Sequence, residues 1–368
     1  MRFGLIGFGA IGKLRAQALQ QTPGAELRVV AEPVAERRAE VAGCGARAVA
    51  TIDDVLANRE IDAVIVSTPP NVHRHHCELA LRAGKHVLCE KPLASTVEDC
   101  RAIVAAAEQA GKTLATGFNY RFYPAVAKAR ELIADGRIGE IDHVKSFAGH
   151  PGGPEFTHAW VHDPAIMGGG ALMDNGIHVA DLTLHFLGAV NERVGLVSEH
   201  VWQFAGSEDN GFLLMQTPEG RAGMLHASWT EWRGYRFHVD IYRTAGCIRV
   251  WYPPMLTILY DRPVGSAKRG RRKIFLFPGF QVMERLRSYR WTVVRSFVAE
   301  HLDFMERVAG RGGVGATDQD GLRAVELTAS AYEGRPFTRR TKAATVLRGA
   351  AGRGVGPGLR RLLLRGRR

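Results

Sequence analysis

Phe3-Gly4-Leu5-Ile6-Gly7-Phe8-Gly9-Ala10-Ile11-Gly12 is the stretch that decides the fold of this 368-residue chain. Its first four residues predict a short strand, and the Gly-x-Gly-x-x-Gly that follows predicts a tight turn into a helix. The first glycine allows the turn, the second lets the backbone approach a pyrophosphate, and the third lets the helix pack on the strand. The free N–H groups at the start of the helix would face the phosphates. We therefore expect residues 7–12 to bind a dinucleotide.

Short apolar strands alternate with helical stretches over residues 1–120. This alternation predicts an α/β domain with a parallel sheet and right-handed crossovers, which is a Rossmann dinucleotide-binding domain. The expected strands are 3–6, 27–31, 48–50, 63–67, 86–89 and 113–116, and the expected helices are 13–21, 34–42, 53–58, 73–83 and 97–110.

Glu32 ends the second expected strand, at the distance from Gly12 where a carboxylate can accept both hydroxyls of the adenosine ribose. A 2′-phosphate at this position would face a like charge, which costs several kcal/mol when both groups are desolvated. We therefore expect NAD rather than NADP. Arg37 and Arg38 keep NADP open, since an arginine can turn toward the phosphate.

Glu90-Lys91-Pro92 closes the fifth expected strand. The carboxyl ends of parallel strands line the crevice where such sheets bind ligands, so Glu90 and Lys91 are expected at the cofactor. Proline cannot continue the hydrogen-bond ladder, so the chain turns at Pro92. The turn would hold the Lys91 cation in the ligand crevice.

The pattern changes after residue 120, where a second domain is expected over residues 121–337. Candidate strands follow one another without intervening helices and predict an open, mostly antiparallel sheet in an α+β domain. These strands are 143–148, 195–201, 211–216, 222–228, 237–243 and 247–250, and helices are expected at 293–308 and 319–332.

The net charge of +12 is concentrated at one end of the chain. Residues 339–368 contain ten Lys or Arg and no acid, which leaves +2 on the rest. We expect residues 338–368 to form a flexible, basic, Gly-rich tail, with weak contact to an acidic surface such as anionic lipid as the alternative. A second basic cluster, Lys268 to Lys273, is expected in one loop. Because the body is near neutral, nucleic acid is not an expected partner.

The segment from Gly168 to Asp181 is the second dense pattern, with three consecutive glycines before the expected start of a helix. Asp174 and His178 are four residues apart, so a helix would place them on one face, with Asp181 near it. A carboxylate beside an imidazole orients it and tunes its pKa toward neutrality. Histidine is also the usual proton acceptor near pH 7. We therefore expect Asp174 and His178 to be catalytic.

His73 follows the loop Thr68-Pro69-Pro70-Asn71, which ends the fourth expected strand, so this loop and His73 are expected beside the cofactor. The spacing of His73, His75, His76 and Cys77 does not suit a shared metal-ligating face, and no metal is expected. The five cysteines are scattered and odd in number, which is typical of reduced thiols.

Taken together, these motifs closely resemble the Gfo/Idh/MocA oxidoreductase family, from Arg2 to about Phe337. The resemblance rests on residues 7–12, 67–73, 83–92, 117–122 and 168–181. It implies a Rossmann domain followed by a domain whose open sheet often forms a dimer or tetramer interface. It also implies a nicotinamide near Lys91 and a sugar or cyclitol substrate beneath it.

The resemblance carries roles onto individual residues. His178 matches the family's acid/base, Lys91 its catalytic lysine, and Asp174 the neighbouring carboxylate that orients substrate. Hydride would pass from the substrate carbon to NAD while His178 takes the hydroxyl proton and Lys91 stabilises the alkoxide. Further sugar contacts are expected from Asn119, Tyr120, Arg121 and Trp160.

The leading hypothesis is thus an NAD-dependent dehydrogenase of a sugar, sugar derivative or inositol, working as a homodimer or homotetramer. Two alternatives remain open: a redox-neutral NAD-dependent glycosidase of the same fold, and a non-catalytic dinucleotide-binding regulator. Because residues 2–6 already form an expected strand, no signal peptide is expected and the default location is cytoplasmic. No apolar run approaches the roughly 18 residues of a membrane span.

Overall fold

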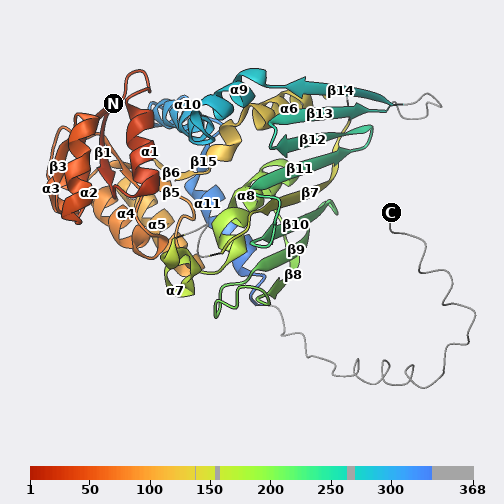
Figure 1. Cartoon of the computed structure of the whole chain (residues 1–368), viewed down its shortest axis with the longest axis horizontal. Coiled ribbons are helices and arrows are strands. Elements are labelled where there is room, and N and C mark those ends of the chain that lie inside the picture. The colour runs from red at the N-terminus through yellow and green to blue at the C-terminus, as the bar shows by residue number, and fades with distance from the viewer. Residues whose placement is uncertain (137, 154–157, 263–269, 334–368) are drawn as a thin grey trace, which may run out of the picture. The chain divides into compact units, whose positions relative to one another are not determined.

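The computed structural model describes residues 1–136, 138–153, 158–262 and 270–333 (Figure 1). The predicted tail, residues 338–368, and part of the predicted basic loop lie outside these residues. Within the described residues, no helix has both the length and the apolar character that a membrane crossing requires.

The first sheet has the expected parallel core. Its strand order is β15-β6-β5-β4-β1-β2-β3, and only β15 runs antiparallel to its neighbour. The strands are β1 (Arg2–Ile6), β2 (Glu26–Ala31), β3 (Arg47–Val49), β4 (Ala63–Val66), β5 (His86–Glu90), β6 (Leu114–Gly117) and β15 (Ala316–Thr317). The helices between them are α1 (Ala10–Leu19), α2 (Ala35–Glu40), α3 (Ile52–Leu56), α4 (His73–Arg82) and α5 (Val97–Ala110).

The α1 helix begins three residues earlier than expected. Gly9 is its N-cap, so the helix starts inside the glycine motif rather than after it. Ala10 and Ile11, which lie within the glycine motif, are therefore the first two residues of the helix, and their backbone N–H groups belong to its N-terminus.

Two late helices return to the first sheet. The helix α10 (Arg290–Val308) packs on α1 through Val294, Phe297 and Val298. The helix α11 (Asp318–Ala329) packs on α5, and its start is fixed by a capping box between Thr317 and Asp320. Residues after 290 thus complete the helical cover of the N-terminal sheet.

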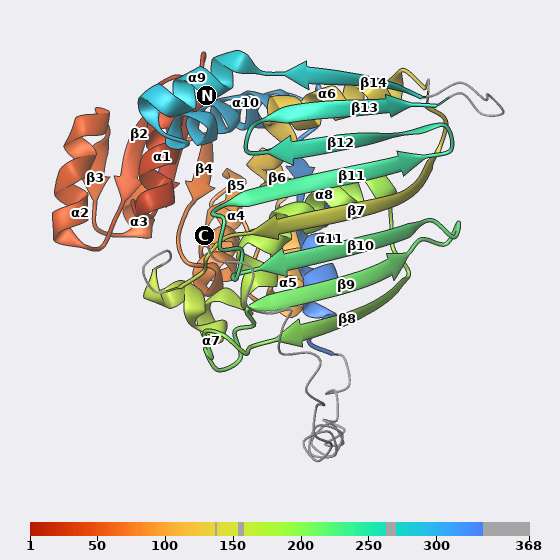
Figure 2. The same cartoon turned by 45° about the vertical axis from the view of Figure 1, so that its right-hand side comes forward.

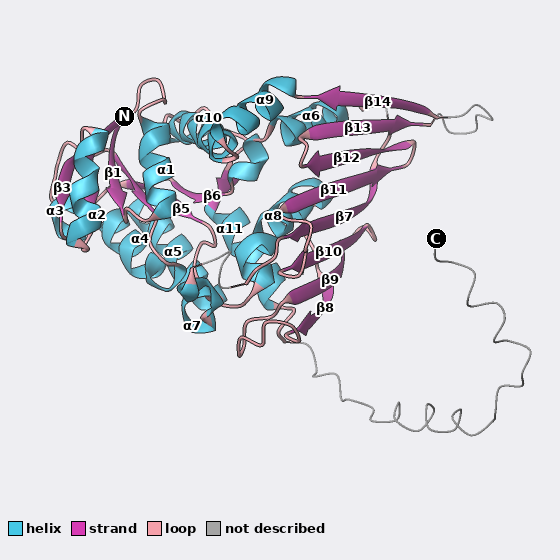
Figure 3. Cartoon of the chain, viewed as in Figure 1, coloured by secondary structure: helices cyan, strands magenta, loops and turns pink. Residues whose placement is uncertain are grey.

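The second sheet has eight strands in the order β14-β13-β12-β11-β7-β10-β9-β8, and only the β7–β10 pair is parallel (Figures 2 and 3). The strands are β7 (Ile141–Gly149), β8 (Glu192–Ser198), β9 (Asn210–Gln216), β10 (Ala222–Ser228), β11 (Arg236–Arg243), β12 (Gly246–Tyr252), β13 (Leu256–Asp261) and β14 (Arg271–Leu276). The expected open, mostly antiparallel sheet is confirmed.

Helices cover one face of this sheet. Figure 2 shows α6 (Pro124–Ala134) and α8 (Ile177–Leu187) behind the strands, where they contact β12 and β7. In β9, buried Leu213 and Met215 alternate with exposed Phe212 and Leu214. The opposite face therefore carries apolar side chains that the described residues leave exposed.

Several elements of this half differ from the expectation. It contains helices that were not predicted, α6 and α9 (Pro278–Arg287), as well as the short α7 (Pro164–Met167) and the strands β13 and β14. The basic residues Arg271, Arg272 and Lys273 belong to the edge strand β14 rather than to a loop. Short 3₁₀ turns lie at 41–44, 70–72, 119–122 and 159–162, and a π turn at 172–176.

Candidate active site

The glycine turn after β1 has the geometry that a pyrophosphate requires. Gly7 has a φ of 91°, and a Cβ on Gly12 would lie 2.2 Å from the Gly7 carbonyl oxygen. A Cβ on Gly9, by contrast, would meet no protein atom within 4 Å. The α1 N-terminus has no side-chain cap, so its N–H groups are open to an anion beside Gly9. These residues fit a dinucleotide.

Glu32 lies at the end of β2 with its carboxylate held by the turn. Its two oxygens accept hydrogen bonds from the N–H of Phe8 (2.9 Å) and of Val34 (3.0 Å), and Arg37 donates a third at 2.9 Å. Burial acts to raise the pKa of Glu32, but these donors outweigh it and hold the pKa below its ordinary value. Arg38 donates to the carbonyl oxygen of Glu32 instead. The anionic charge expected at this position is present, with Arg37 paired to it.

His73 does not face open space beside the cofactor turn. It is fully buried, with Nε2 at 2.7 Å from the Thr68 carbonyl oxygen and Nδ1 at 3.0 Å from that of Pro92. The imidazole of His73 is therefore held by backbone carbonyl oxygens of the protein, and its place beside the cofactor stays a prediction. His73 ties the Thr68 loop to the Lys91-Pro92 turn, while Pro69 and Asn71 on the same loop are exposed.

Glu90 also has a different partner from the one expected. Its carboxylate accepts from Arg15 Nε at 2.6 Å, and Arg15 reaches Glu300 at 2.5 Å. Arg15 is fully buried and lies over the Phe297 ring. Burial raises the pKa of Glu300 to about 7. Glu90 therefore joins the end of β5 to α1 and α10, so its carboxylate is not free for a ligand.

Lys91 and Asp174 meet between the two sheets. The ammonium of Lys91 donates to the Asp174 carbonyl oxygen at 2.6 Å and lies 3.6 Å from its carboxylate. The carboxylate also accepts from His150 Nε2 (2.9 Å) and Trp229 Nε1 (3.1 Å). Burial acts to raise the pKa of Asp174, but the hydrogen bond from His150 and the charge of Lys91 hold the pKa far below its ordinary value. Asp174 is therefore an anion at neutral pH.

His178 lies on α8 and is buried, but it makes no hydrogen bond to Asp174. The expected orienting bond is wrong, because Asp174 turns its oxygens to His150, Trp229 and Lys91 instead. The His178 ring stacks on Tyr120 at 3.9 Å between ring centroids, and among the described residues its Nδ1 has no hydrogen-bond partner. Burial lowers the pKa of His178 well below its ordinary value, and the Lys91 charge lowers it further. The imidazole is neutral near pH 7.

Arg121 was expected to contact substrate, but in the structure its guanidinium is paired with carboxylates of the protein. It makes a two-pronged bond to Asp181, with its closest contact at 2.6 Å, and also reaches Asp320 at 3.2 Å. Both Arg121 and Asp181 are almost fully buried. The carboxylate of Asp181 is therefore bonded to Arg121 and is not directed toward His178.

The other expected substrate residues lie in three different settings. Tyr120 covers the His178 ring, and its hydroxyl is hydrogen-bonded to that of Tyr235. Asn119 is buried and donates to Ser296 Oγ at 2.8 Å. Trp160 is exposed on the 3₁₀ turn at 159–162. Of these, Tyr120 alone contacts Lys91, Asp174 or His178 within the described part of the chain.

Three site residues were missed. His150 directly follows β7, and its Nδ1 accepts the Gly152 N–H at 3.1 Å, which leaves Nε2–H to donate to Asp174. Trp229 follows β10 directly. Asn175 is buried, and neither atom of its amide has a partner within the described part of the chain. A polar residue directly after a strand, as His150 is after β7, was the available signal. A buried amide that has no partner in the protein can hydrogen-bond to a bound polar ligand or to water.

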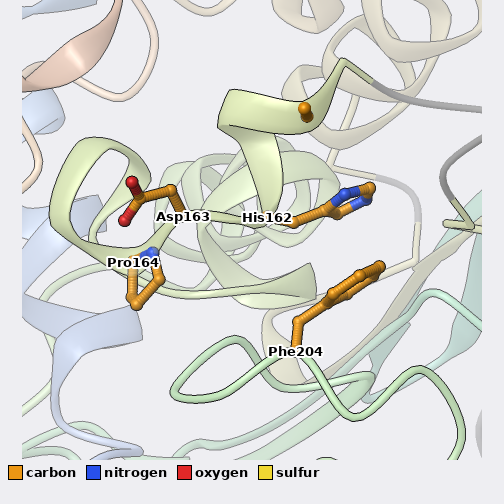
Figure 4. Close-up of a pocket in the computed structure, with 5 residues that line it drawn as sticks. His162, Asp163, Pro164 and Phe204 are labelled. Carbon is orange, nitrogen blue, oxygen red and sulfur yellow. The ribbon is translucent and has the colours of Figure 1, made fainter.

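A pocket of about 450 Å³ lies beside this cluster (Figure 4). It is lined by Ala159, His162, Asp163, Pro164 and Phe204. His162 stacks on Phe204 and lies edge-on to Trp229 at 5.3 Å. Trp229 therefore contacts both His162 of this pocket and the carboxylate of Asp174. Across the described ranges, no three His, Cys, Asp or Glu side chains are grouped as metal ligands would be.

Comparisons with known proteins cover both halves of the chain. Residues 1–118 match the family model described as an oxidoreductase family with an NAD-binding Rossmann fold, and residues 126–249 match the GFO/IDH/MocA C-terminal domain. An inositol 2-dehydrogenase of Rhizobium meliloti (strain 1021) is 31% identical over 252 residues, which are 67% of this chain and 74% of that protein. A 1,5-anhydro-D-fructose reductase of Ensifer adhaerens is 38% identical over 189 residues, or 50% of this chain and 56% of the reductase.

Solved structures agree with this match. A levoglucosan dehydrogenase in complex with NADH has a TM-score of 0.79 at 25% identity, covering 90% of this chain and 97% of that one. The predicted Rossmann fold, the second domain class and the NAD-type cofactor are confirmed by these findings.

Proposed function

We propose that this chain, which belongs to the GFO/IDH/MocA oxidoreductase family, is an NAD-dependent dehydrogenase that oxidises a secondary alcohol of a sugar, a sugar derivative or inositol, or reduces the matching ketone. The observation that carries the proposal is the grouping of Lys91, Asp174 and neutral His178 at the carboxyl end of β5, in the same parallel sheet whose strand β1 leads into the glycine turn. The named activities of the similar proteins, an inositol dehydrogenase, an anhydrofructose reductase and a levoglucosan dehydrogenase, support the substrate class.

His178 is the proposed acid/base. A base must be unprotonated at the working pH, and burial together with the Lys91 charge keeps this imidazole neutral. The stacked Tyr120 ring fixes the plane of His178, which compensates for the missing bond to a carboxylate. A ring nitrogen of His178 then accepts the proton of the substrate hydroxyl.

Lys91 is the proposed electrostatic partner of the reacting oxygen. As the hydroxyl loses its proton, negative charge grows on that oxygen, and a fixed ammonium lowers the energy of the charge. Asp174 holds Lys91 through its carbonyl oxygen and is itself held by His150 and Trp229. NAD, when bound, supplies the carbon that accepts the hydride.

Glu32 is the proposed determinant of NAD over NADP. Its charge is kept by Phe8, Val34 and Arg37, and an added 2′-phosphate would approach an anion. The charge of Arg37 partly offsets this repulsion, so we expect NADP to bind more weakly than NAD and not to be excluded.

We also propose a homodimer or homotetramer built on the open face of the second sheet. This face carries exposed apolar side chains on neighbouring strands, which is typical of a surface that is covered by another protein. These side chains are Val194, Leu196, Phe212, Leu214 and Met224.

The function is tested by a screen of sugars, nucleotide sugars and inositols with NAD⁺ and NADP⁺ in parallel, following the absorbance of the reduced nicotinamide. We expect at least one polyol or sugar to reduce NAD⁺ with a higher kcat/KM than NADP⁺. Activity with NADP⁺ alone would contradict the role of Glu32. Glycoside cleavage without net reduction would instead support the redox-neutral glycosidase.

A further inference from the structure

The helix α9 is attached to the protein by one side only. Phe280 packs edge-on against Trp291 with ring centroids 5.1 Å apart, and Glu284 accepts a hydrogen bond from Tyr252 Oη at 3.0 Å and another from Thr292. These contacts hold the helix against α10, beside which it lies in Figure 1. No residue of α9 is buried.

The other side of α9 combines apolar and basic side chains. Val282, Leu286 and Tyr289 are 53%, 74% and 60% exposed, which is high for large apolar groups. Val282 and Leu286 are four residues apart on α9 and therefore lie on one face of this helix. Tyr289 follows the helix, after Ser288, whose φ of 71° ends it. Arg285, Arg287 and Arg290 alternate with them and are exposed. We call these six residues the α9 surface.

The charge of the α9 surface is of one sign. Glu284 is the single acid between residues 278 and 291, and its carboxylate is turned inward to Tyr252 and Thr292. The three arginines are therefore not neutralised by a neighbouring acid of this segment. A second copy of the chain seated here about a two-fold axis would place like charges against each other, which is unfavourable.

We propose that the α9 surface docks the protein onto membranes that contain anionic phospholipid. Helices of this kind lie in the plane of the interface, with apolar side chains among the upper acyl chains and arginines on the lipid phosphates. Val282, Leu286 and Tyr289 provide the inserted groups, and Arg285, Arg287 and Arg290 provide bidentate donors for phosphate. Docking of this kind is separate from the proposed active site and does not depend on the substrate.

The test is flotation of the full chain with vesicles of phosphatidylcholine alone and of roughly three parts phosphatidylcholine to one part phosphatidylglycerol. We expect wild type to float with the anionic vesicles and not with the neutral ones. Val282→Ser with Leu286→Ser should weaken this binding by about tenfold or more, since both inserted side chains are lost. The matched control, Leu302→Ser with Val314→Ser, changes one exposed leucine and one exposed valine elsewhere and should stay within about twofold.

A variant of the C-terminal residues distinguishes the contribution of the α9 surface to vesicle binding from that of the basic C-terminal residues. Arg360→Gln, Arg361→Gln and Arg365→Gln together should leave the effect of the α9 substitutions in place. The proposal is overturned if wild type does not bind anionic vesicles, if the α9 and control pairs behave alike, or if only the tail variant loses binding. It is also overturned if the α9 pair lowers the mass measured by light scattering, because a protein partner would then cover this surface.

Discussion

Replacing Lys91 with Met should lower kcat for alcohol oxidation by about 10²–10³-fold, the loss typical of removing one preorganised charge from a developing oxyanion. Methionine keeps much of the length and apolar stem of lysine but cannot donate to the Asp174 carbonyl oxygen or to a substrate oxygen. Because the Lys91 charge lowers the pKa of His178, the substitution should also move the acidic limb of the kcat/KM profile to higher pH. Steady-state kinetics over a range of pH measures both effects.

Lys112→Met is the matched control for this substitution. Lys91 follows β5 and lies at the carboxyl ends of the parallel strands. Lys112 precedes β6 and therefore lies at the amino ends of the same strands, on the opposite side of the sheet from the proposed site. We expect wild-type kcat for this variant. A Lys91→Met enzyme with unchanged kcat and an unmoved pH profile would remove Lys91 from the mechanism.

Asp181→Asn should lower the free energy of unfolding by about 3 kcal/mol, the lower end of the range for breaking a buried ion pair. The amide keeps the shape of the carboxylate but leaves the Arg121 guanidinium with a neutral partner in a nearly dry site. Asp320 and the carbonyl oxygens of Val314 and Gly315 still face Arg121, which limits the loss. Urea unfolding followed by circular dichroism measures the change.

Glu78→Gln provides the same chemical change at the surface. Glu78 pairs with Arg74 and Arg82 in the solvent-exposed part of α4, where such pairs contribute within about 0.5 kcal/mol. An equal loss in the free energy of unfolding for the two variants would show that the buried Arg121–Asp181 pair contributes no more to stability than the surface pairs of Glu78.

The features that could be predicted from sequence are local ones. The glycine turn, the alternation of strands and helices, and the position of Lys91 at the end of β5 depend on residues close together in the chain. Each feature also has its own physical requirement. The glycine turn needs open space beside Gly9, the strands need a hydrogen-bond ladder, and the end of β5 needs a residue such as Pro92 that cannot continue this ladder. The motif at Gly168–Asp181 was located for the same reason.

The partners of charged side chains could not be predicted, because they come from distant parts of the chain. Arg15 joins Glu90 to Glu300, and Arg121 joins Asp181 to Asp320. A sequence pattern shows that such residues are charged but not whether the charge meets a ligand or another residue. Asp174 illustrates the consequence, since it was paired with His178 by spacing but bonds to His150 and Trp229.

The helix α9 escaped prediction for a different reason. Its N-cap and first two residues are Phe277-Pro278-Gly279, a sequence typical of a turn, and its apolar residues Val282 and Leu286 are exposed. Periodicity identifies helices by the stripe that they bury, so a helix that buries little carries a weak signal.

Single-turnover hydride transfer from the best substrate to bound NAD⁺ in His178→Ala tests the assignment of His178 as the base. We expect a rate reduced by about 10²–10⁴-fold, the usual contribution of a positioned base, with partial recovery on adding free imidazole. His185→Ala, on the same helix α8 but outside the Lys91–Asp174 cluster, should transfer hydride at the wild-type rate. An unchanged rate in His178→Ala would contradict the assignment of His178 as the base.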